Sequence, residues 1–150
     1  MVTRFEHFTY AISEIHRYWH KIAADEMTKY GLKGPYAVYL ATLHRHPEGI
    51  TASRLGEECG RDKSDVSRAI AVMLEKEMIK RTGKSQKYRA QLVLTEKGRI
   101  AAEHVSERAR MAVEEGGRGL DEERRTVLYE TLDLIVSNLH KVSETGLGEK

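Results

Sequence analysis

The stretch from Ile50 to Thr95 constrains the fold of this 150-residue chain more than any other part of it. Thr51 suits the N-cap of a short helix, because its side-chain oxygen can accept from a free amide of the first turn. The buried stripe of this helix is predicted to be Ala52, Leu55 and Cys59. Gly60 is expected to end the helix, and Asp62 to cap a longer second one. Two short apolar helices around a tight glycine turn are typical of a helix-turn-helix.

The second helix of this pair has two chemically different faces. One face is predicted to be buried and consists of Val66, Ile70, Met73 and Leu74. The opposite face is polar and carries Ser64 and Arg68, with Ser67 to one side. A second helix of this kind can enter the major groove of DNA. The candidate DNA contacts of this region are Arg61, Lys63, Ser64, Asp65, Ser67 and Arg68.

A basic β-hairpin is predicted directly after these two helices. Met78-Ile79 begins one strand, and Gln91 to Leu94 has the apolar run of a return strand. No acidic residue lies between Met78 and Val93. A basic hairpin in this position is a wing, suited to phosphates or to the minor groove. The candidate DNA contacts of the wing are Lys84, Lys87, Tyr88 and Arg89.

Two segments beside the predicted wing carry a family resemblance. The segment Leu74-Glu75-Lys76-Glu77-Met78-Ile79-Lys80-Arg81 precedes the wing, and Leu94-Thr95-Glu96-Lys97-Gly98 follows it. On these residues the chain resembles the MarR family of winged-helix regulators. The resemblance implies a homodimer that binds double-stranded DNA, and a one-residue strand at Ile50 beside the wing. The family usually has an Asp-x-Arg element in the wing, whereas this chain has Gln86-Lys87-Tyr88-Arg89, so Arg89 would act without an aspartate to orient it.

Charge is concentrated in the predicted winged helix rather than in the chain as a whole. The net charge is only +2, but residues 45–97 contain 12 basic and 8 acidic residues. Such a positive region is the expected electrostatic footprint of a DNA-binding protein. We expect a cytoplasmic protein with no membrane partner. The chain has a single cysteine, it has no apolar run near 20 residues, and it begins with the polar segment MVTRFEHFTY.

Long helices with apolar seams are predicted at both ends of the chain. In the first, Phe5, Phe8, Ile12, Ile15, Trp19 and Ile22 follow the spacing of a heptad seam. The last helix repeats that spacing after the break at 116–119. We expect dimerisation through Phe5, Phe8, Ile12, Ile15, Leu128, Leu132, Ile135 and Leu139. The alternative is that these helices pack only on their own subunit.

The predicted fold is therefore mainly α with a small β-hairpin wing, in the α+β class. A single MarR-like domain would span residues 1–150. The winged-helix DNA-binding lobe is predicted over about 36–98, and the dimerisation helices over about 3–30 and 99–143. We expect the chain to act as a homodimeric DNA-binding repressor on a pseudo-palindromic operator.

A cluster of aromatic residues suggests a site for a small aromatic or anionic effector that relieves repression. MarR-like proteins bind such ligands near the junction of the dimerisation helices and the winged helix. The candidate pocket residues are His16, Arg17, Trp19, Tyr36, Tyr39 and Leu43, although plain core packing explains the aromatic ones equally well.

Other chemistry has weaker support in the sequence. His16 and His20 have the i, i+4 spacing of a chelating pair, so a zinc-sensing regulator of the same fold is one alternative. A winged helix used as a protein-interaction adaptor is another. No metal or cofactor is predicted, and no nucleophile–base pair or nucleotide loop indicates an enzyme. Cys59 is expected to pack in the core rather than to act as a redox switch.

Overall fold

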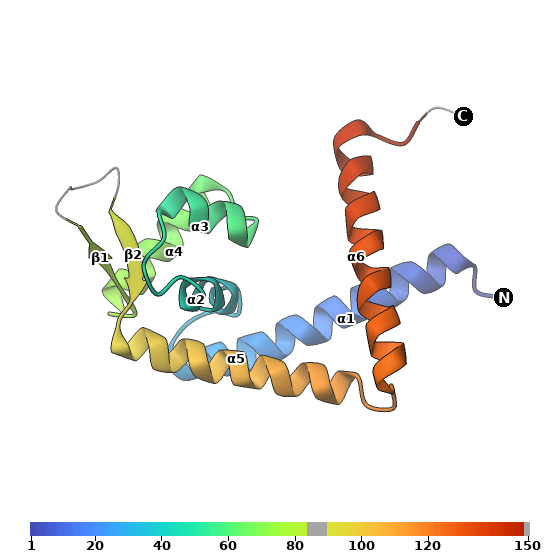
Figure 1. Ribbon diagram of the computed structural model, residues 1–150, viewed down its shortest axis with the longest axis horizontal. Helices are drawn as coiled ribbons and strands as arrows, with labels where there is room; N and C mark the ends of the chain where they lie inside the picture. Colours follow the sequence, from blue (N-terminus) through green and yellow to red (C-terminus); the bar gives the residue numbers. More distant parts are fainter. Residues whose placement is uncertain (84–89, 149–150) are drawn as a thin grey trace. The chain divides into compact units, whose positions relative to one another are not determined.

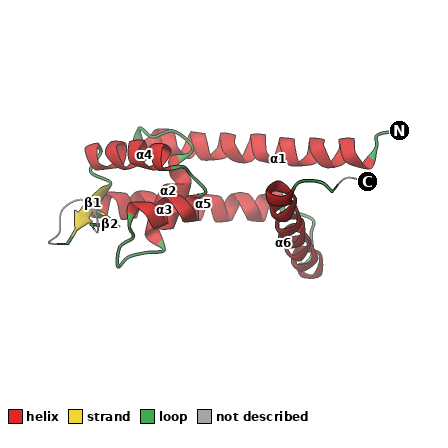
Figure 2. Cartoon of the chain, turned by 90° about the horizontal axis from the view of Figure 1, so that it is seen from above, coloured by secondary structure: helices red, strands yellow, loops and turns green. Residues whose placement is uncertain are grey.

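The computed structural model describes residues 1–83 and 90–148 and divides into two compact units, Met1–Ala112 and Val113–Lys150. Its elements, in chain order, are α1 (Arg4–Met27), η1 (Thr28–Tyr30), α2 (Tyr36–His44), α3 (Ala52–Cys59), α4 (Lys63–Glu75), β1 (Ile79–Thr82), β2 (Gln91–Leu94), α5 (Glu96–Gly116) and α6 (Glu122–Thr145). The predicted class is confirmed: helices dominate, and β1 and β2 form one antiparallel hairpin. In two perpendicular views, α2, α3 and α4 gather beside that hairpin (Figure 1 and Figure 2).

Local chemistry sets the ends of the helices in the first unit. At the start of α1, the Thr3 hydroxyl accepts from the Glu6 amide at 3.2 Å, and the Glu6 carboxylate accepts from the Thr3 amide at 2.7 Å. This reciprocal pair satisfies two amides that the helix itself leaves free. After η1, Gly31 takes a left-handed conformation with φ 65°, which turns the chain towards α2.

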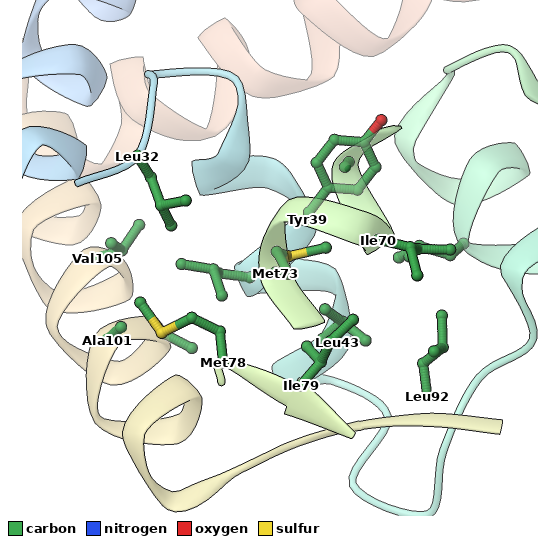
Figure 3. Packing of buried hydrophobic residues seen from close by; sticks show 14 of the residues in the cluster. Leu32, Tyr39, Leu43, Ile70, Met73, Met78, Ile79, Leu92, Ala101 and Val105 are labelled. Atoms are coloured by element: carbon green, nitrogen blue, oxygen red, sulfur yellow. The ribbon is translucent and has the colours of Figure 1, made fainter. Parts of the chain in front are cut away.

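The core of the first unit joins α2, α4, the hairpin and α5. Leu43 of α2, Met73 of α4, Leu92 of β2 and Ala101 of α5 are at most 1 % exposed, and Figure 3 shows them in one cluster. Ala101 and Ala102 are both fully buried. Their small side chains let α5 approach the rest of the core closely.

One part of the predicted helix-turn-helix core is wrong. Ala52 is exposed, whereas Leu55 and Gly56 are the buried residues of α3. A Cβ atom at Gly56 would lie 2.9 Å from Cγ2 of Val66, so the glycine permits a close crossing of α3 and α4. The eight-residue helix meets its neighbours through its middle, and its first residue therefore stays in solvent.

The two long terminal helices carry exposed apolar residues, each within its own unit. On α1, Phe5 is 76 % exposed and Ile15 is 64 % exposed. On α6, Leu128 is 40 % exposed and Leu139 is 54 % exposed. Ile135 is half-buried, and every residue of α6 that the structure describes is at least partly exposed. The predicted seams therefore remain largely in solvent in a single chain.

The glycine-rich break within the second unit is a tight turn rather than a phosphate loop. Gly119 has φ 92°, a conformation that side chains disfavour. Arg125 of α6 donates to the carbonyl oxygen of Gly117 at 3.2 Å and lies 3.2 Å from the Glu114 carboxylate. The guanidinium thus binds carbonyl and carboxylate oxygens at the end of α5.

Candidate nucleic-acid interface

The turn between α3 and α4 is built from capping interactions. Gly60 ends α3 with φ 62°, and the Arg61 amide then donates to the carbonyl oxygen of Gly56 at 2.9 Å. Asp62 caps α4, because its carboxylate accepts from the Asp65 amide at 2.8 Å. These bonds fix where α4 begins, and hence which of its residues face solvent.

The outer face of α4 is polar and exposed, as its sequence predicted. Val66, Ile70 and Met73 are buried, whereas Ser64, Ser67 and Arg68 are exposed and Asp65 is half-buried. The Arg68 guanidinium donates to the Ser64 hydroxyl at 3.0 Å and forms an ion pair with the Asp65 carboxylate. These contacts hold the guanidinium along the outside of the helix.

Arg61 and Lys63 extend this polar face towards α3. Both are exposed, and both border a surface pocket of about 460 Å³ between the two helices, together with Ser67. These two cations and the Ser67 hydroxyl can donate hydrogen bonds to a phosphate group, and the Glu57 carboxylate lines the same pocket. The structure thus brings Arg61, Lys63, Ser64, Asp65, Ser67 and Arg68 together on one surface.

The described part of the wing is basic on its surface. Ile79 is buried and pairs with Leu94, whereas Lys80 and Arg81 of β1 are exposed. Ile50 forms an isolated antiparallel bridge with Leu92, so the predicted one-residue strand beside the wing is confirmed. The predicted wing contacts Lys84, Lys87, Tyr88 and Arg89 lie outside the described residues.

The segment Leu94-Thr95-Glu96-Lys97-Gly98, which follows the wing, connects the base of the wing to α4 and α5. The Thr95 hydroxyl donates to the carbonyl oxygen of Glu77 at 2.6 Å and accepts from the Gly98 amide at 3.1 Å. Lys97 reaches the carbonyl oxygen of Lys76 at 2.9 Å. The residues that carry the family resemblance therefore join the end of α4, the hairpin and the start of α5.

The six candidate effector residues lie in different surroundings. Tyr39 and Leu43 are 3 % and 1 % exposed and belong to the core, and burial raises the pKa of Tyr39. Tyr36 packs partly against that core, with its ring centroid 6.1 Å from that of Tyr39. Trp19 alone of the six borders a small cavity of about 60 Å³, whose wall includes Ala37 and Arg108.

The two polar members of that candidate set have partners on α1 itself. Arg17 donates to the Glu14 carboxylate at 2.6 Å and to the Tyr18 hydroxyl at 2.9 Å. The His16 ring lies against the His20 ring, with centroids 4.0 Å apart and the planes tilted by 41°. Among the residues that the structure describes, no group of three histidine, cysteine, aspartate or glutamate side chains is arranged to hold a metal ion.

A buried carboxylate beside the cavity was not predicted. Glu26 of α1 is 8 % exposed and accepts from Lys29 at 2.7 Å, from His104 at 2.8 Å and from Arg108 at 2.9 Å. These donors, led by Lys29, lower the pKa of Glu26 to about 2. The only sequence signal for this cluster is an acidic residue at the edge of an apolar stripe, and nothing local identifies its distant partners on α5.

Cys59 lies at the end of α3 and is half-buried, as the core-packing interpretation requires. Its Sγ lies 3.4 Å from the Thr42 hydroxyl oxygen and 3.9 Å from the Val38 carbonyl oxygen. Burial raises the pKa of the Cys59 thiol, which disfavours the reactive thiolate.

Comparisons with known proteins agree with this geometry. A sequence model of the MarR family matches residues 30–87. The fold is similar to that of a MarR transcriptional regulator from Methanosarcina mazei Go1, with a TM-score of 0.77 and 23 % identity over 91 % of this chain and 92 % of that one. No curated protein matches the chain.

Two further similar structures contain DNA. One is a MarR-family regulator from Listeria monocytogenes complexed with a 26mer DNA, with a TM-score of 0.76 and 20 % identity over 95 % of this chain and 97 % of that one. The other is the S. aureus MepR–DNA complex, with a TM-score of 0.74 and 20 % identity over 91 % of this chain and 96 % of that one. Within the described residues, no helix is long and apolar enough to cross a membrane.

The matched segment contains α2, α3, α4 and β1, which hold the polar helix face and the described part of the basic wing. The fold shared with the solved structures extends to the long helices on both sides. Residues 30–87 thus match the MarR family of transcriptional regulators, and the chain has the fold of the solved MarR regulators.

Proposed function

We propose that this chain binds double-stranded DNA as a homodimer, with α4 in the major groove and the wing at phosphates or the minor groove. The observation that carries the proposal is the outer face of α4, where Arg68 lies exposed beside Ser64 and Asp65. A guanidinium in this position can donate two parallel hydrogen bonds to a guanine edge. The exposed Lys80 and Arg81 add positive charge at the base of the wing.

The exposed seams of α1 and α6 support the homodimer. Apolar residues such as Phe5 and Leu139, which are 76 % and 54 % exposed, are candidates for burial by a second copy. Two-fold symmetry would place two copies of α4 in major grooves about one helical turn apart, so the operator would be pseudo-palindromic. In this proposal both compact units belong to one MarR-like domain, and the protein works in the cytoplasm where its DNA lies.

Selection of bound fragments from genomic DNA of the host, followed by a salt titration, tests this function. A single enriched pseudo-palindrome is expected, with affinity that falls steeply as salt rises, because phosphate contacts release counterions. An absence of DNA retention at every salt concentration would instead favour the protein-interaction adaptor. Zinc sensing would require operator affinity that changes on adding zinc alone.

The regulatory part of the proposal is that binding represses transcription and that a small aromatic or anionic effector relieves repression. The cavity beside Trp19 supports this site: Arg108 lies at its wall, where its Nε already donates to Glu26, a second residue of the lining. The cavity of about 60 Å³ is far smaller than the roughly 300 Å³ of an ordinary ligand pocket, so the effector would have to enlarge it.

Trp19 is the only tryptophan, so its fluorescence tests this site directly. A panel of aromatic acids is expected to include one that changes the fluorescence and lowers operator affinity. Coupling between two such sites is typically about 1–3 kcal/mol and is reciprocal. A panel that moves neither signal would count against the effector site and would leave the DNA-binding proposal intact.

A further inference from the structure

The polar surface of the helix-turn-helix carries three cations that differ in their partners. Arg61, Lys63 and Arg68 are all exposed. Among the residues that the structure describes, Arg68 alone of these three forms an ion pair with a carboxylate, that of Asp65. Glu57 lines the same pocket as Arg61 and Lys63 without an ion pair to either. The positive charge of Arg68 is therefore balanced within its own helix, whereas the charges of the other two are not paired in this way.

The Arg68 guanidinium keeps free donors while it is held by its neighbours. Its Nη1 donates to the Ser64 hydroxyl at 3.0 Å, and its Nη2 donates to Oδ1 of Asp65. A guanidinium has five N–H donors, so these two contacts leave three of them available. Two parallel N–H groups are what the O6 and N7 atoms of a guanine accept in the major groove. The contacts within α4 thus leave enough donors for a base edge.

The Asp65 carboxylate starts from a well-fixed piece of backbone. The Asp65 amide donates to the Asp62 carboxylate at 2.8 Å, which is the N-cap of α4. The next residue, Val66, is 4 % exposed and holds this turn against the core. A short side chain on fixed backbone can limit the many rotamers of a long arginine side chain. Freedom that is already lost before binding does not have to be removed by DNA.

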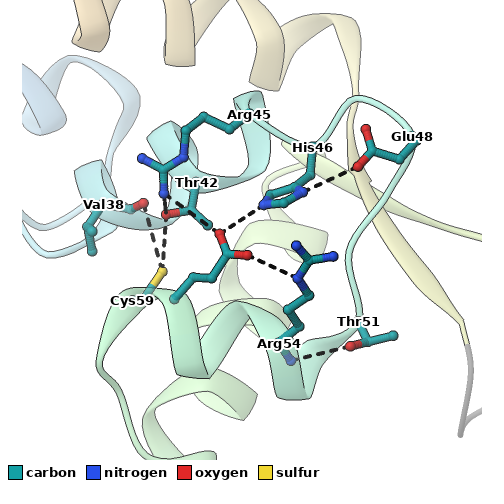
Figure 4. A network of polar contacts seen from close by, with 9 residues as sticks. Val38, Thr42, Arg45, His46, Glu48, Thr51, Arg54 and Cys59 are labelled. Carbon is teal, nitrogen blue, oxygen red and sulfur yellow. Dashed lines mark hydrogen bonds and ion pairs between the residues drawn. The ribbon is translucent and has the colours of Figure 1, made fainter.

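Another arginine–carboxylate pair of the helix-turn-helix has a different setting. On α3, the Nε of Arg54 donates to the Glu58 carboxylate at 3.0 Å (Figure 4). Glu58 also lies 2.8 Å from Nε2 of His46 in the loop after α2, so that pair connects two elements. Within the described residues, the Asp65 carboxylate has only Arg68 of the same helix as a hydrogen-bond or ion-pair partner.

The pair between Asp65 and Arg68 therefore does little for the stability of the fold. Its side chains are 41 % and 68 % exposed, and exposed pairs of this kind contribute little to stability. Its main consequence is for the position and the net charge of the Arg68 guanidinium, on the surface that DNA would cover.

We propose that Asp65 is a specificity-determining residue, which positions Arg68 for a base edge and keeps it from binding phosphates. This inference rests on the proposed DNA-binding function. A guanidinium with a bound carboxylate attracts a phosphate less strongly but keeps its remaining donors, and phosphate contacts carry no sequence information. The carboxylate also repels phosphates itself. Asp65 thus lowers affinity for DNA in general and raises the difference between the operator and other sequences.

The variant Asp65→Asn of the full-length chain tests this role, with Asp62→Asn as its matched control. Both variants remove one negative charge from the start of α4. Asparagine caps a helix about as well as aspartate, and Asp62 does not contact Arg68, so the control keeps both the cap and the pair. Affinity is measured at constant salt and pH on the selected operator, on a scrambled duplex, and on operators changed at the base pair to which Arg68→Ala is sensitive.

Asp65→Asn is expected to raise affinity for the scrambled duplex and to lower the ratio of operator to scrambled affinity about threefold to tenfold per half-site, which is part of the discrimination of one bidentate contact. The loss should fall on the base pair that Arg68 reads. Asp62→Asn should change both affinities by the same factor and leave their ratio unaltered. A purely structural role of Asp65 would likewise lower both affinities together and would not move the ratio.

The same substitution in the Arg68→Ala background completes the test, because residues that act as a unit are not additive. There, Asp65→Asn should leave the ratio unchanged. The inference is overturned if Asp65→Asn keeps the wild-type ratio, or if it lowers the ratio equally without Arg68, since Asp65 would then act on DNA by itself. If the wild type prefers no sequence, the proposed function fails and this inference fails with it. Sequence-specific binding with an unchanged ratio in Asp65→Asn overturns the inference alone.

Discussion

The α-carbon of Gly98 lies directly against the carbonyl oxygen of Met78, so that a methyl group on Gly98 would overlap that oxygen. The same oxygen accepts from the Thr95 amide at 2.9 Å. The first turn of α5 thus packs onto the start of the hairpin with no room for a side chain. This close approach gives a physical reason for the glycine in the segment Leu94-Thr95-Glu96-Lys97-Gly98.

Gly98→Ala is expected to lower the free energy of unfolding by about 1–3 kcal/mol, because backbone at the wing base must move to admit the methyl group. Denaturant unfolding at fixed protein concentration measures the change. Gly116→Ala is the control, since a Cβ there meets nothing within 4 Å. Equal stability of the two variants would contradict the close approach at Met78.

Glu26→Gln is expected to destabilise the chain at neutral pH by about 1–3 kcal/mol, because it weakens hydrogen bonds from the cations around a buried carboxylate. The folded-state pKa of Glu26 is about 2, below its ordinary value of 4.5. Its contribution is therefore full above about pH 4.5 and is lost as the pH falls towards 2. Unfolding midpoints of the wild type and the variant should converge in acid.

Glu107→Gln provides the matched control for that experiment. Glu107 lies on the part of α5 that belongs to the first unit. It pairs with an arginine, Arg110, as Glu26 pairs with Arg108, but its side chain is 55 % exposed. Little change in stability is expected from this variant at any pH. A gap between wild type and Glu26→Gln that stays constant down to pH 2 would show that the charge of Glu26 is not what stabilises the cluster.

Arg68→Ala and Lys63→Ala are expected to weaken DNA binding in different ways. Loss of Arg68 should cost about 1–3 kcal/mol on the selected operator and relax preference at one base pair per half-site. Loss of Lys63 should weaken binding to many sequences and flatten the slope of log K against log salt by about 1 per subunit. Salt titrations on operator and scrambled duplexes measure both effects. Small, equal effects on both duplexes would contradict the placement of α4 in the major groove.

Ile15→Lys is expected to weaken dimerisation while leaving the winged-helix core folded. Ile15 is 64 % exposed in the single chain, so its replacement costs little there, but a lysine would be buried without a partner in the proposed dimer. A loss of about 2 kcal/mol, or about thirtyfold in the dimer Kd, is expected in sedimentation experiments. Ser13→Lys, on the opposite side of α1, should leave the dimer intact. A wild type that is monomeric at micromolar concentration would exclude the dimer.

The helix-turn-helix and the two faces of α4 could be predicted from the sequence because their causes are local. Thr51, Asp62 and Gly60 act on amides and carbonyls within a few residues of themselves. The helical period alone separates Val66, Ile70 and Met73 from Ser64 and Arg68. The hairpin could also be predicted from the sequence, because a basic loop lies between two apolar runs.

The burial and the partners of individual side chains could be known only from the tertiary structure, because they depend on which distant element packs against each side chain. Tyr39 and Leu43 were grouped with Trp19 as candidate pocket residues, yet both are buried in the core of the first unit, whereas Trp19 borders a cavity. Glu26 meets Arg108, which lies 82 residues later, and His46 meets Glu58 across the end of α3. No periodicity encodes such pairs, since a hydrogen bond between residues far apart in sequence exists only after the backbone has brought them within about 3 Å.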